Sequence, residues 1–280
     1  MDVNIPASQI EADVQRTLAE DVGDGDLSAL IVPSATRSHA VVICRQSAVI
    51  CGQPWVMETL RQAVPDAQVH WLVPDGARCE PGQRIFEVHA GARELLTAER
   101  TCLNFLQFLS GISTKTAVFV ERVKGTAARV LDTRKTIPGL RQAEKYAVRC
   151  GGGHNHRMGL FDAVLIKENH ISAAGGLTAA FQSATAMAPQ ATFIQVEVET
   201  LAQLEEALAI GVTMVLLDNM APDTIRAAVT MAGGCCSLEV SGGVNLENIG
   251  AYAETGVDRI SVGALVKDVT AADFSMRFLA

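Results

Sequence analysis

From residue 129 onward, short apolar runs alternate with segments of helical periodicity, and this alternation constrains the fold more than any other feature. The apolar runs are RVLDT, AVLIK, FIQVEV, MVLLD, CSLEV and RISVGA. Segments such as TLAQLEEALAIG and APDTIRAAVTMAG separate them. Strand and helix in alternation are typical of a parallel sheet with right-handed crossovers. Because the strands are almost continuously apolar, the sequence favours an α/β barrel or a doubly wound sheet.

The residues at the strand ends distinguish these two folds. Asp132, Lys167 and Asp218 end three of the predicted strands, and a fourth carries Glu197 and Glu199 near its end. The last two strands run into glycines. In α/β barrels the active site is built at the C-terminal ends of the strands. We therefore predict a barrel, and an incomplete one because six strands are evident. The chain contains neither a GxGxxG nor a GxxxxGK[ST] motif.

The region before residue 129 has a different pattern. The runs HAVVICR, AVICG, AQVHWLV and RIFEVHA are bounded by glycine, proline or polar turns. They are typical of strands in a mixed, largely antiparallel sheet. A helical pattern follows from about Glu94 to Lys124, with a break expected at Ser110-Gly111.

The formal net charge of -8 argues against a nucleic-acid partner, because binding to a phosphate backbone requires a basic surface. The charge is unevenly distributed, however. Between Asp132 and Lys167 there are seven Lys or Arg residues and three Asp or Glu residues. A basic cluster in an acidic protein predicts a site for a small anion.

No apolar run is long enough to span a bilayer, and the N-terminus lacks the basic start and apolar core of a secretory signal. We therefore expect no membrane association. The seven cysteines are odd in number and scattered, which fits reduced thiols in a cytoplasm better than a disulfide framework. We interpret the adjacent pair Cys235-Cys236 as core packing.

Two basic motifs follow the first predicted barrel strand. In DTRKTIPGLR, Arg134 can form a bidentate pair with a carboxylate, and Lys135 offers a compact charge for a phosphate. An exposed basic loop is the alternative. In GGGHNHR, the glycines can present backbone amides to an anion, and His156 and Arg157 supply side-chain donors.

The GGGHNHR segment has a second interpretation, as a zinc site. Its potential ligands are Cys150, His154 and His156. A CxxxHxH spacing is not an established zinc pattern, and no acidic or cysteine partner lies close in sequence. Anion binding is therefore favoured, and His154 receives no role.

The charged strand ends leave alternatives open. Lys167 either holds an anion or forms a Schiff base, and the neighbouring cations favour the anion. Glu197 and Asp218 either hold Mg²⁺ and ribose hydroxyls or act as a glycosidase acid and nucleophile. The basic surroundings suit the first interpretation, and Glu199 ranks behind Glu197. SGG at 241–243 and VGAL at 262–265 follow the last two strands, where barrels commonly bind phosphate. Glycine there is also ordinary turn chemistry.

Taken together, these segments resemble the quinolinate phosphoribosyltransferase family. The matching segments are EDVGDGDLS, TAERTCLNFLQFLSGIST, LDTRKTIPGLRQAEKYAVRCGGGHNHRMGLFDAVLIKENH, VEVET, LLDN, EVSGGVNLENI and ETGVDRISVGAL. The resemblance follows the chain order and covers most of the chain. It implies an N-terminal α/β sandwich domain at 1–108 and an incomplete, six- to seven-stranded α/β barrel at 109–267. Residues 268–280 are expected to rejoin the first domain.

The resemblance also implies an activity. Such an enzyme, a pentosyl glycosyltransferase of NAD biosynthesis, transfers phosphoribosyl from 5-phosphoribosyl 1-pyrophosphate to quinolinate with decarboxylation. The products are nicotinate mononucleotide, pyrophosphate and CO₂. A cytoplasmic homodimer using Mg²⁺ is expected. A related protein encoded with molybdate transporters shares the fold but is expected to lack the NHR and LIKxNH residues, which are intact here.

Residue roles follow from the same resemblance. Quinolinate is expected to contact Arg100 of a neighbouring subunit and, within one subunit, Thr133, Arg134, His156, Arg157 and Lys167. The residues expected to serve phosphoribosyl pyrophosphate and Mg²⁺ are Lys135, Glu197 and Asp218, and these three with Lys167 form the predicted catalytic set. The 5′-phosphate is expected to bind Ser241, Gly242, Gly243, Gly263, Ala264 and Leu265.

Overall fold

The structure, a computed structural model, describes residues 5–279 and divides the chain into two compact units. The first unit comprises the residues up to Ala117, Pro138–Gly152 and the residues from Asp268 onward. The second comprises Val118–Ile137 and Gly153–Lys267. Residues 109–117 and 138–152, which were expected in the barrel domain at 109–267, belong to the first unit.

The first unit is built on a four-stranded antiparallel sheet with the order β12-β1-β5-β3. The strands are β1 (Arg37–Cys44), β3 (Gln68–Trp71), β5 (Arg84–Gly91) and β12 (Phe274–Leu279). The C-terminal strand β12 thus pairs with β1 and forms one edge. A separate two-stranded ribbon joins β2 (Ala48–Val49) to β4 (Arg78–Cys79).

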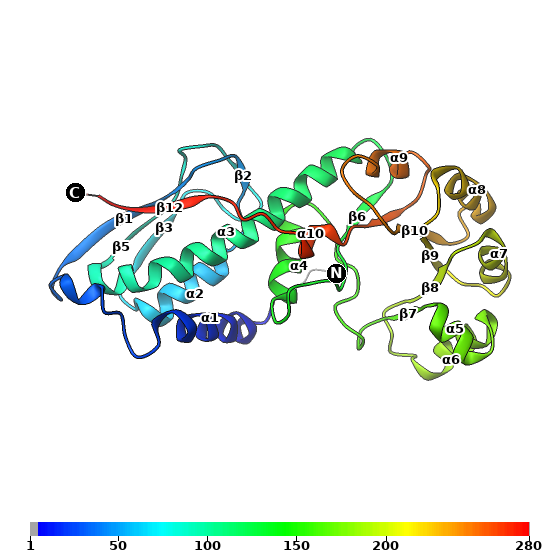
Figure 1. Ribbon diagram of the computed structural model, residues 1–280, viewed down its shortest axis with the longest axis horizontal. Coiled ribbons are helices and arrows are strands. Elements are labelled where there is room, and N and C mark those ends of the chain that lie inside the picture. Colours follow the sequence, from blue (N-terminus) through cyan, green and yellow to red (C-terminus); the bar gives the residue numbers. More distant parts are fainter. Residues whose placement is uncertain (1–4, 280) are drawn as a thin grey trace. The chain divides into compact units, whose positions relative to one another are not determined.

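Helices cover one face of this sheet because the apolar residues of its strands alternate. Ala40, Val42 and Cys44 of β1 are buried in one core cluster with residues of two helices. Those helices are α2 (Gln53–Ala63), which contributes Val56 and Leu60, and α3 (Ala92–Arg122). Figure 1 shows α2 and α3 along one side of the sheet. The unit also contains α1 (Ala7–Val22), a short 3₁₀ turn (Ala29–Ile31) and α4 (Arg141–Cys150).

The expected break at Ser110-Gly111 is wrong, because α3 runs through it without interruption. The glycine has another reason to be there. A Cβ atom at Gly111 would lie 2.3 Å from the carbonyl oxygen of Thr270 and 3.1 Å from Cα of Ala271. The helix and the segment that leads to β12 therefore pack backbone against backbone. This close approach, rather than a turn, requires glycine.

The second unit is a six-stranded sheet in which every neighbouring pair is parallel, with the order β6-β11-β10-β9-β8-β7. The strands are β6 (Arg129–Leu131), β7 (Val164–Ile166), β8 (Ile194–Val198), β9 (Met214–Asp218), β10 (Ser237–Ser241) and β11 (Arg259–Ser261). The first strand, β6, adjoins the last, β11, as in a barrel, while β6 and β7 remain the two ends of the sheet. The predicted fold class, with an incomplete barrel, is confirmed.

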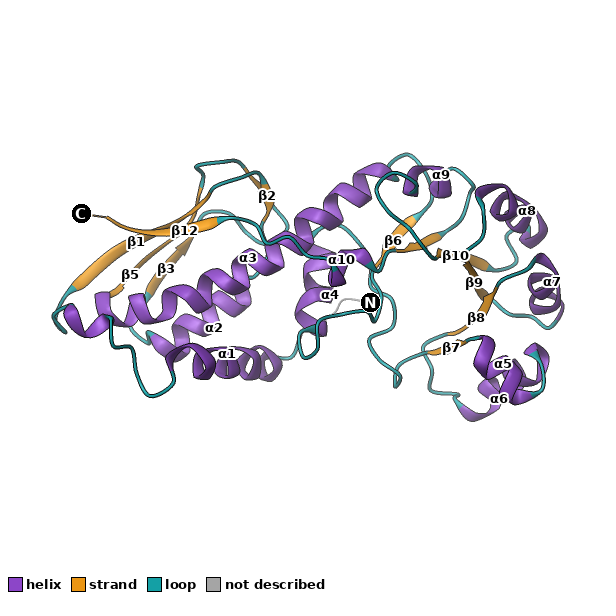
Figure 2. Cartoon of the chain, viewed as in Figure 1, coloured by secondary structure: helices purple, strands orange, loops and turns teal. Residues whose placement is uncertain are grey.

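Helices α5 to α9 lie on the outer side of the sheet in Figure 2. They are α5 (Glu168–Ala174), α6 (Leu177–Met187), α7 (Leu201–Ala209), α8 (Pro222–Ala232) and α9 (Ile249–Ala253), and the short α10 (Ala264–Lys267) follows β11. Local chemistry fixes where two of them begin. The Thr200 hydroxyl accepts a hydrogen bond from the Gln203 backbone N–H, and the Gln203 side chain accepts one from the Thr200 N–H, which is a capping box. Pro222 occupies the first turn of α8.

The parallel register brings the strand ends to one edge of the sheet. Asp218 of β9 pairs with Ser241 of β10, and Leu216 of β9 pairs with Glu197 of β8. Short connections to the capped helices keep these ends open. None of the described helices combines the length and the apolar character needed to cross a membrane.

The packing at Gly111 generates a stability prediction. Gly111→Ala should lower the free energy of unfolding by about 1–3 kcal/mol and the melting temperature by roughly 2–10 °C, because backbone atoms must move to admit the methyl group. The control is Gly250→Ala in α9, where the nearest atom to a new Cβ is 3.9 Å away. It should be neutral or slightly stabilising. Equal melting temperatures for the two variants in thermal unfolding would contradict this explanation.

Candidate active site

A cavity of about 570 Å³ opens at the carboxyl edge of the parallel sheet in the second unit. Eleven of the predicted site residues line it: Thr133, Arg134, Lys135, His156, Arg157, Lys167, Glu197, Asp218, Ser241, Gly242 and Gly243. Five further lining residues were not predicted: Leu165, Leu216, Asn219, Glu239 and Ser261. The sequence motifs therefore identified most of the cavity wall, from four different strand ends and two loops.

An ion pair crosses the mouth of the cavity. The Lys167 Nζ lies 2.6 Å from Oε2 of Glu197. Lys167 follows β7, and its backbone N–H donates to Nδ1 of His170 at 3.0 Å, which fixes the chain where the strand ends. Glu197 comes from β8, the neighbouring strand. The charge of this lysine is therefore held at the cavity, with its carboxylate partner only slightly exposed.

Asp218 ends β9 beside this pair. Burial is the main cause that raises the pKa of its carboxyl, and the negative charge of Glu197 raises it further. The positive charges of Lys167 and Lys135 act in the opposite direction. Two carboxylates thus repel one another inside the cavity while two lysines partly compensate. A bound cation would therefore stabilise the two carboxylates in their ionised form.

The imidazole of His156 contacts a cluster of buried polar side chains. Its Nδ1 accepts the backbone N–H of Arg157 at 2.7 Å. In the neutral ring the proton is therefore on Nε2, which lies 3.0 Å from Oε1 of Gln195 and 3.4 Å from Oε1 of Glu239. Two side chains, Gln195 of β8 and Glu239 of β10, thus fix the orientation of the imidazole ring.

Glu239 anchors that cluster, and its carboxylate is fully buried. It accepts hydrogen bonds from Nε2 of Gln195 at 3.1 Å, from Nε of Arg259 at 2.9 Å and from the Ser261 hydroxyl. A buried carboxylate needs such compensation. Glu239 interrupts the apolar run CSLEV, and an acidic residue inside a buried strand is the sequence signal that points to it.

Arg157 is almost buried, with 9% of its surface exposed, and its guanidinium donates to the carbonyl oxygen of Ala163 at 3.1 Å. Burial is the largest cause that lowers its pKa, and the positive charge of Arg134 lowers it further. Asp162 opposes this effect. Two guanidinium groups are thus held near one another at an energetic cost that a bound anion would relieve.

The GGGHNHR segment is held against β6. The backbone N–H of His154 donates to the carbonyl of Val130 at 2.8 Å, and that of Asp132 donates to the carbonyl of His154 at 3.1 Å. The buried Asp132 carboxylate accepts the side-chain N–H of Asn155 at 2.5 Å and the backbone N–H of His156 at 2.9 Å. His154 therefore extends the sheet edge, and the following residues turn toward the cavity.

The glycines after β10 form a tight backbone turn. Gly242 has φ +100°, and a Cβ there would lie 2.1 Å from the Asn219 side-chain oxygen. Gly243 has φ +60°. Asn219, itself at φ 53°, donates its backbone N–H to the carbonyl of Ser241 at 3.0 Å and its side-chain N–H to Asp218 at 2.9 Å. The loops after β9 and β10 are thereby locked together at the cavity rim.

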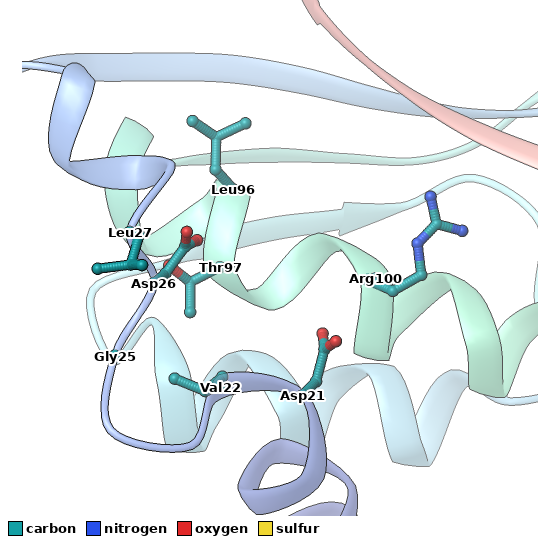
Figure 3. Close-up of a pocket in the computed structure, with 8 residues that line it drawn as sticks. All are labelled: Asp21, Val22, Gly25, Asp26, Leu27, Leu96, Thr97 and Arg100. Atoms are coloured by element: carbon teal, nitrogen blue, oxygen red, sulfur yellow. The ribbon is translucent and has the colours of Figure 1, made fainter.

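The remaining predicted residues lie elsewhere. Gly263, Ala264 and Leu265 do not line the cavity, although a Cβ at Gly263 would lie 3.3 Å from Cδ of Lys135. Leu265 is completely buried. Glu199 is exposed beyond the end of β8. Arg100 belongs to α3 in the first unit, where it lines a separate hollow of about 350 Å³ (Figure 3).

With this geometry in view, comparison with known proteins identifies the family. The quinolinate phosphoribosyl transferase N-terminal domain matches residues 26–110, and the C-terminal domain of the same enzymes matches residues 112–277. The chain belongs to the quinolinate phosphoribosyltransferase family. The resemblance inferred from the sequence motifs is therefore confirmed.

Close relatives match almost end to end. A nicotinate-nucleotide pyrophosphorylase [carboxylating] of Mycobacterium leprae is 42% identical, over 94% of this chain and 95% of its own. A probable nicotinate-nucleotide pyrophosphorylase [carboxylating] of Bacillus subtilis is 39% identical, over 92% and 89%. The solved structure of the nicotinate-nucleotide pyrophosphorylase from Francisella tularensis superimposes with a TM-score of 0.97 at 43% identity, over 100% of this chain and 99% of that one.

The pKa of Asp218 generates a pH prediction. Because the folded-state pKa of this acid is raised, its ionisation destabilises the fold at pH values above the folded pKa, and the effect vanishes below the unfolded pKa near 3.8. Asp218→Asn should therefore raise the melting temperature by roughly 1–4 °C at pH 7, with no advantage at about pH 3.5. Thermal scans across this range measure it. The control Glu199→Gln, at an exposed position, should change little. A gain that grows as pH falls would reverse the assigned sign.

Proposed function

We propose that this chain transfers the phosphoribosyl group of 5-phosphoribosyl 1-pyrophosphate to quinolinate with decarboxylation, giving nicotinate mononucleotide, pyrophosphate and CO₂ in NAD biosynthesis. The observation that carries the proposal is the cavity itself. It gathers Arg134, Lys135, Arg157 and Lys167 in a protein of net charge -8. The names of the relatives point to the same activity.

Quinolinate carries two carboxylates on adjacent ring carbons, and the cavity offers matching donors. Arg134 lies close enough to Arg157 to lower the pKa of Arg157, so that two carboxylates can be held by two neighbouring guanidinium groups. His156 adds a ring of fixed orientation to the cavity wall, because Gln195 holds its Nε2–H. These groups are held in place before the substrate binds, which lowers the cost of orienting it.

The phosphoribosyl half of the site lies on the other strands. Gly242 and Gly243 expose backbone at the carboxyl end of β10, where barrels commonly bind phosphate. Lys135 and Lys167 supply compact positive charge for the pyrophosphate. The pyridine nitrogen of quinolinate can then attack the anomeric carbon as pyrophosphate leaves.

The carboxylates fit a Mg²⁺ ion that arrives with the pyrophosphate. Mg²⁺ is usually bound by one or two carboxylates together with substrate phosphates. Burial and, to a smaller extent, the negative charge of Glu197 raise the pKa of Asp218, so that a cation bound here would stabilise its ionised form. Glu197 and Asp218 are therefore the residues that would hold the ion. When bound, Mg²⁺ supplies charge neutralisation for the leaving pyrophosphate.

The protein side chains contribute positioning and electrostatics to the chemical steps. As the anomeric carbon becomes electron-poor, Asp218 is the better placed carboxylate to stabilise it, because Glu197 is already paired with Lys167. After the nitrogen is alkylated, the 2-carboxylate leaves as CO₂, and the bonding electron pair stays on C2, where the positive ring nitrogen stabilises it. C2 then takes a proton from water to give nicotinate mononucleotide. The cations that held this carboxylate keep the ring aligned until the bond breaks.

The alternatives for Lys167 and the acidic pair are less well supported. A Schiff-base lysine must lose its proton to attack a carbonyl, whereas Lys167 is held by a carboxylate at 2.6 Å. The same ion pair occupies Glu197, which a glycosidase would need as nucleophile or acid. A related reaction is phosphoribosyl transfer to nicotinate, without decarboxylation. Nicotinate has a single carboxylate, so one of the two guanidinium groups would have no carboxylate to bind.

We further propose a homodimer in which Arg100 of one subunit completes the cavity of the other. Arg100 lines its hollow together with Leu27 and Leu96, and Leu27 is 83% exposed. In the second unit, Leu160 and Phe161 are 74% and 77% exposed close to Arg157 in the chain. Exposed apolar side chains of this size mark interaction surfaces. The free cysteines of the described residues support a reducing compartment, the cytoplasm.

The activity test mixes purified protein with quinolinate, phosphoribosyl pyrophosphate and Mg²⁺ and follows nicotinate mononucleotide. Product should form, and replacing quinolinate by nicotinate should reduce kcat/KM by about 100-fold or more, because the second carboxylate loses its partner. Omission of either substrate is the control. No product at high enzyme concentration, or equal rates with both acids, would refute the assignment.

The shared cavity predicts recovery in mixed dimers. Arg100→Ala and Lys167→Ala should each lose at least about 100-fold in activity. After subunit exchange, an equal mixture should regain about a quarter of wild-type activity, because half the dimers carry one intact cavity.

The matched control is a mixture of Arg134→Ala with Lys167→Ala. Both residues line the same cavity of one subunit, so no intact cavity can form. Recovery in this control, or none in the first mixture once native mass spectrometry demonstrates exchange, would argue against a borrowed Arg100.

A further inference from the structure

Two thiols and a carboxylate meet in the first unit, at a place that the proposed reaction does not use. Among the described residues, one group of at least three His, Cys, Asp or Glu side chains has its ligand atoms within 4.8 Å of one another. It consists of Cys51, Asp75 and Cys150. Cys51 lies between β2 and α2, Asp75 between β3 and β4, and Cys150 ends α4. Three segments that are distant in sequence thus converge.

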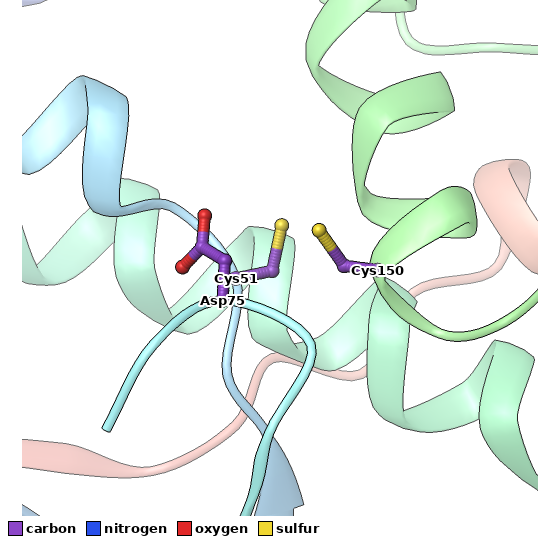
Figure 4. Close-up of side chains that lie close together, drawn as sticks. All are labelled: Cys51, Asp75 and Cys150. Carbon is purple, nitrogen blue, oxygen red and sulfur yellow. The ribbon is translucent and has the colours of Figure 1, made fainter. Parts of the chain in front are cut away.

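The backbone positions of both cysteines are fixed by α3. The Ser110 hydroxyl accepts the backbone N–H of Cys51 at 3.0 Å and donates to its carbonyl oxygen at 3.1 Å. Gly151, directly after Cys150, packs so tightly that a Cβ would lie 2.4 Å from the carbonyl oxygen of Ser113. Figure 4 shows the two sulfur atoms pointing toward one another, with Asp75 beside Cys51.

Asp75 is oriented by three donors. Its carboxylate accepts the backbone N–H groups of Gly52 at 3.1 Å and Gln53 at 3.2 Å, and the Tyr146 hydroxyl at 2.9 Å. A carboxylate has about four lone-pair positions, and Oδ1 is used only by a shared bond from Gln53. One oxygen therefore retains capacity for a ligand.

We propose that Cys51, Cys150 and Asp75 form a binding site for a thiophilic divalent cation, best matched by Zn²⁺, with water in the fourth position. Two sulfur ligands and one carboxylate oxygen suit Zn²⁺, whereas Mg²⁺ requires oxygen ligands. With two thiolates and one carboxylate as ligands, the Zn²⁺ site would carry a net charge of about -1. The site is therefore chemically distinct from the carboxylate pair in the cavity.

Metal binding must displace the thiol protons. The Cys51 side chain is fully buried. Cys150 is only half-buried, so the ion has a route to the buried thiol. Once bound, the ion would tie the end of α4 to the start of α2.

The test uses the full-length chain, reduced and freed of metal by chelation, and titrates it with Zn²⁺ or with Co²⁺. About one ion should bind per chain, and Co²⁺ should give the intense visible absorption of a tetrahedral thiolate site together with thiolate charge-transfer bands. Cys51→Ser and Cys150→Ser should each weaken binding by more than about 100-fold. Cys235→Ser should bind as the wild type does, because the Cys235 thiol is exposed; of the pair expected to pack in the core, only Cys236 is buried. Excess Mg²⁺ should not displace the ion.

A second measurement needs no variant. Zn²⁺ should slow alkylation of Cys150 in the wild-type protein, followed by peptide mass spectrometry, and leave that of Cys235 unchanged. No binding to the reduced chain, or binding that survives both serine substitutions, would overturn the proposal. So would a Cys51–Cys150 disulfide in the isolated protein that binds no Zn²⁺ after reduction. These outcomes do not depend on phosphoribosyl transfer.

Discussion

The arrangement of the second unit depends on the electrostatic balance among the charged side chains that line its cavity. Arg157 is nearly buried, and Arg134 lies close enough to lower its pKa, which is unfavourable for both cations. Nearby, Asp218 has a raised pKa because burial and Glu197 disfavour its charge. Like charges are thus held together on both sides of the cavity. Such strain persists only when the surrounding fold provides the energy, and it is relieved when reactants of complementary charge bind.

The parallel sheet supplies that support. Glu197 and Asp218 lie at strand ends, so the backbone hydrogen bonds of the sheet set their positions. Arg157 lies on a loop, where its guanidinium donates to the carbonyl oxygen of Ala163. Beneath them, Glu239 joins Gln195, Arg259 and Ser261 in a buried cluster whose polar groups find partners. His156 takes its orientation from this cluster. The cluster therefore acts indirectly, by fixing the His156 ring in the cavity wall rather than by touching the reacting atoms.

The charged residues of the cavity could be predicted from the sequence, whereas the buried cluster beneath them could not. Residues such as Lys167 and Asp218 were identified because their strands are apolar and end abruptly in a charge, which is a local pattern. The cluster around Glu239 was missed because its hydrogen bonds join three strands, and no local spacing records them. The continuity of α3 was missed for a similar reason. Gly111 resembles a helix break in sequence, and only its contact with Thr270 shows that close packing is its purpose.

The carboxylates of the cavity and of the Cys51 site have different partners. In the cavity of the second unit, Glu197 is paired with Lys167. In the first, the Asp75 carboxylate is satisfied mainly by neutral donors, two backbone N–H groups and the Tyr146 hydroxyl. Its neighbours Cys51 and Cys150 are neutral while protonated. A site without a fixed cation can accept one, whereas a site already furnished with lysine and arginine attracts anions. The same acidic chain can therefore offer one place for a cation and another for phosphorylated, carboxylated reactants.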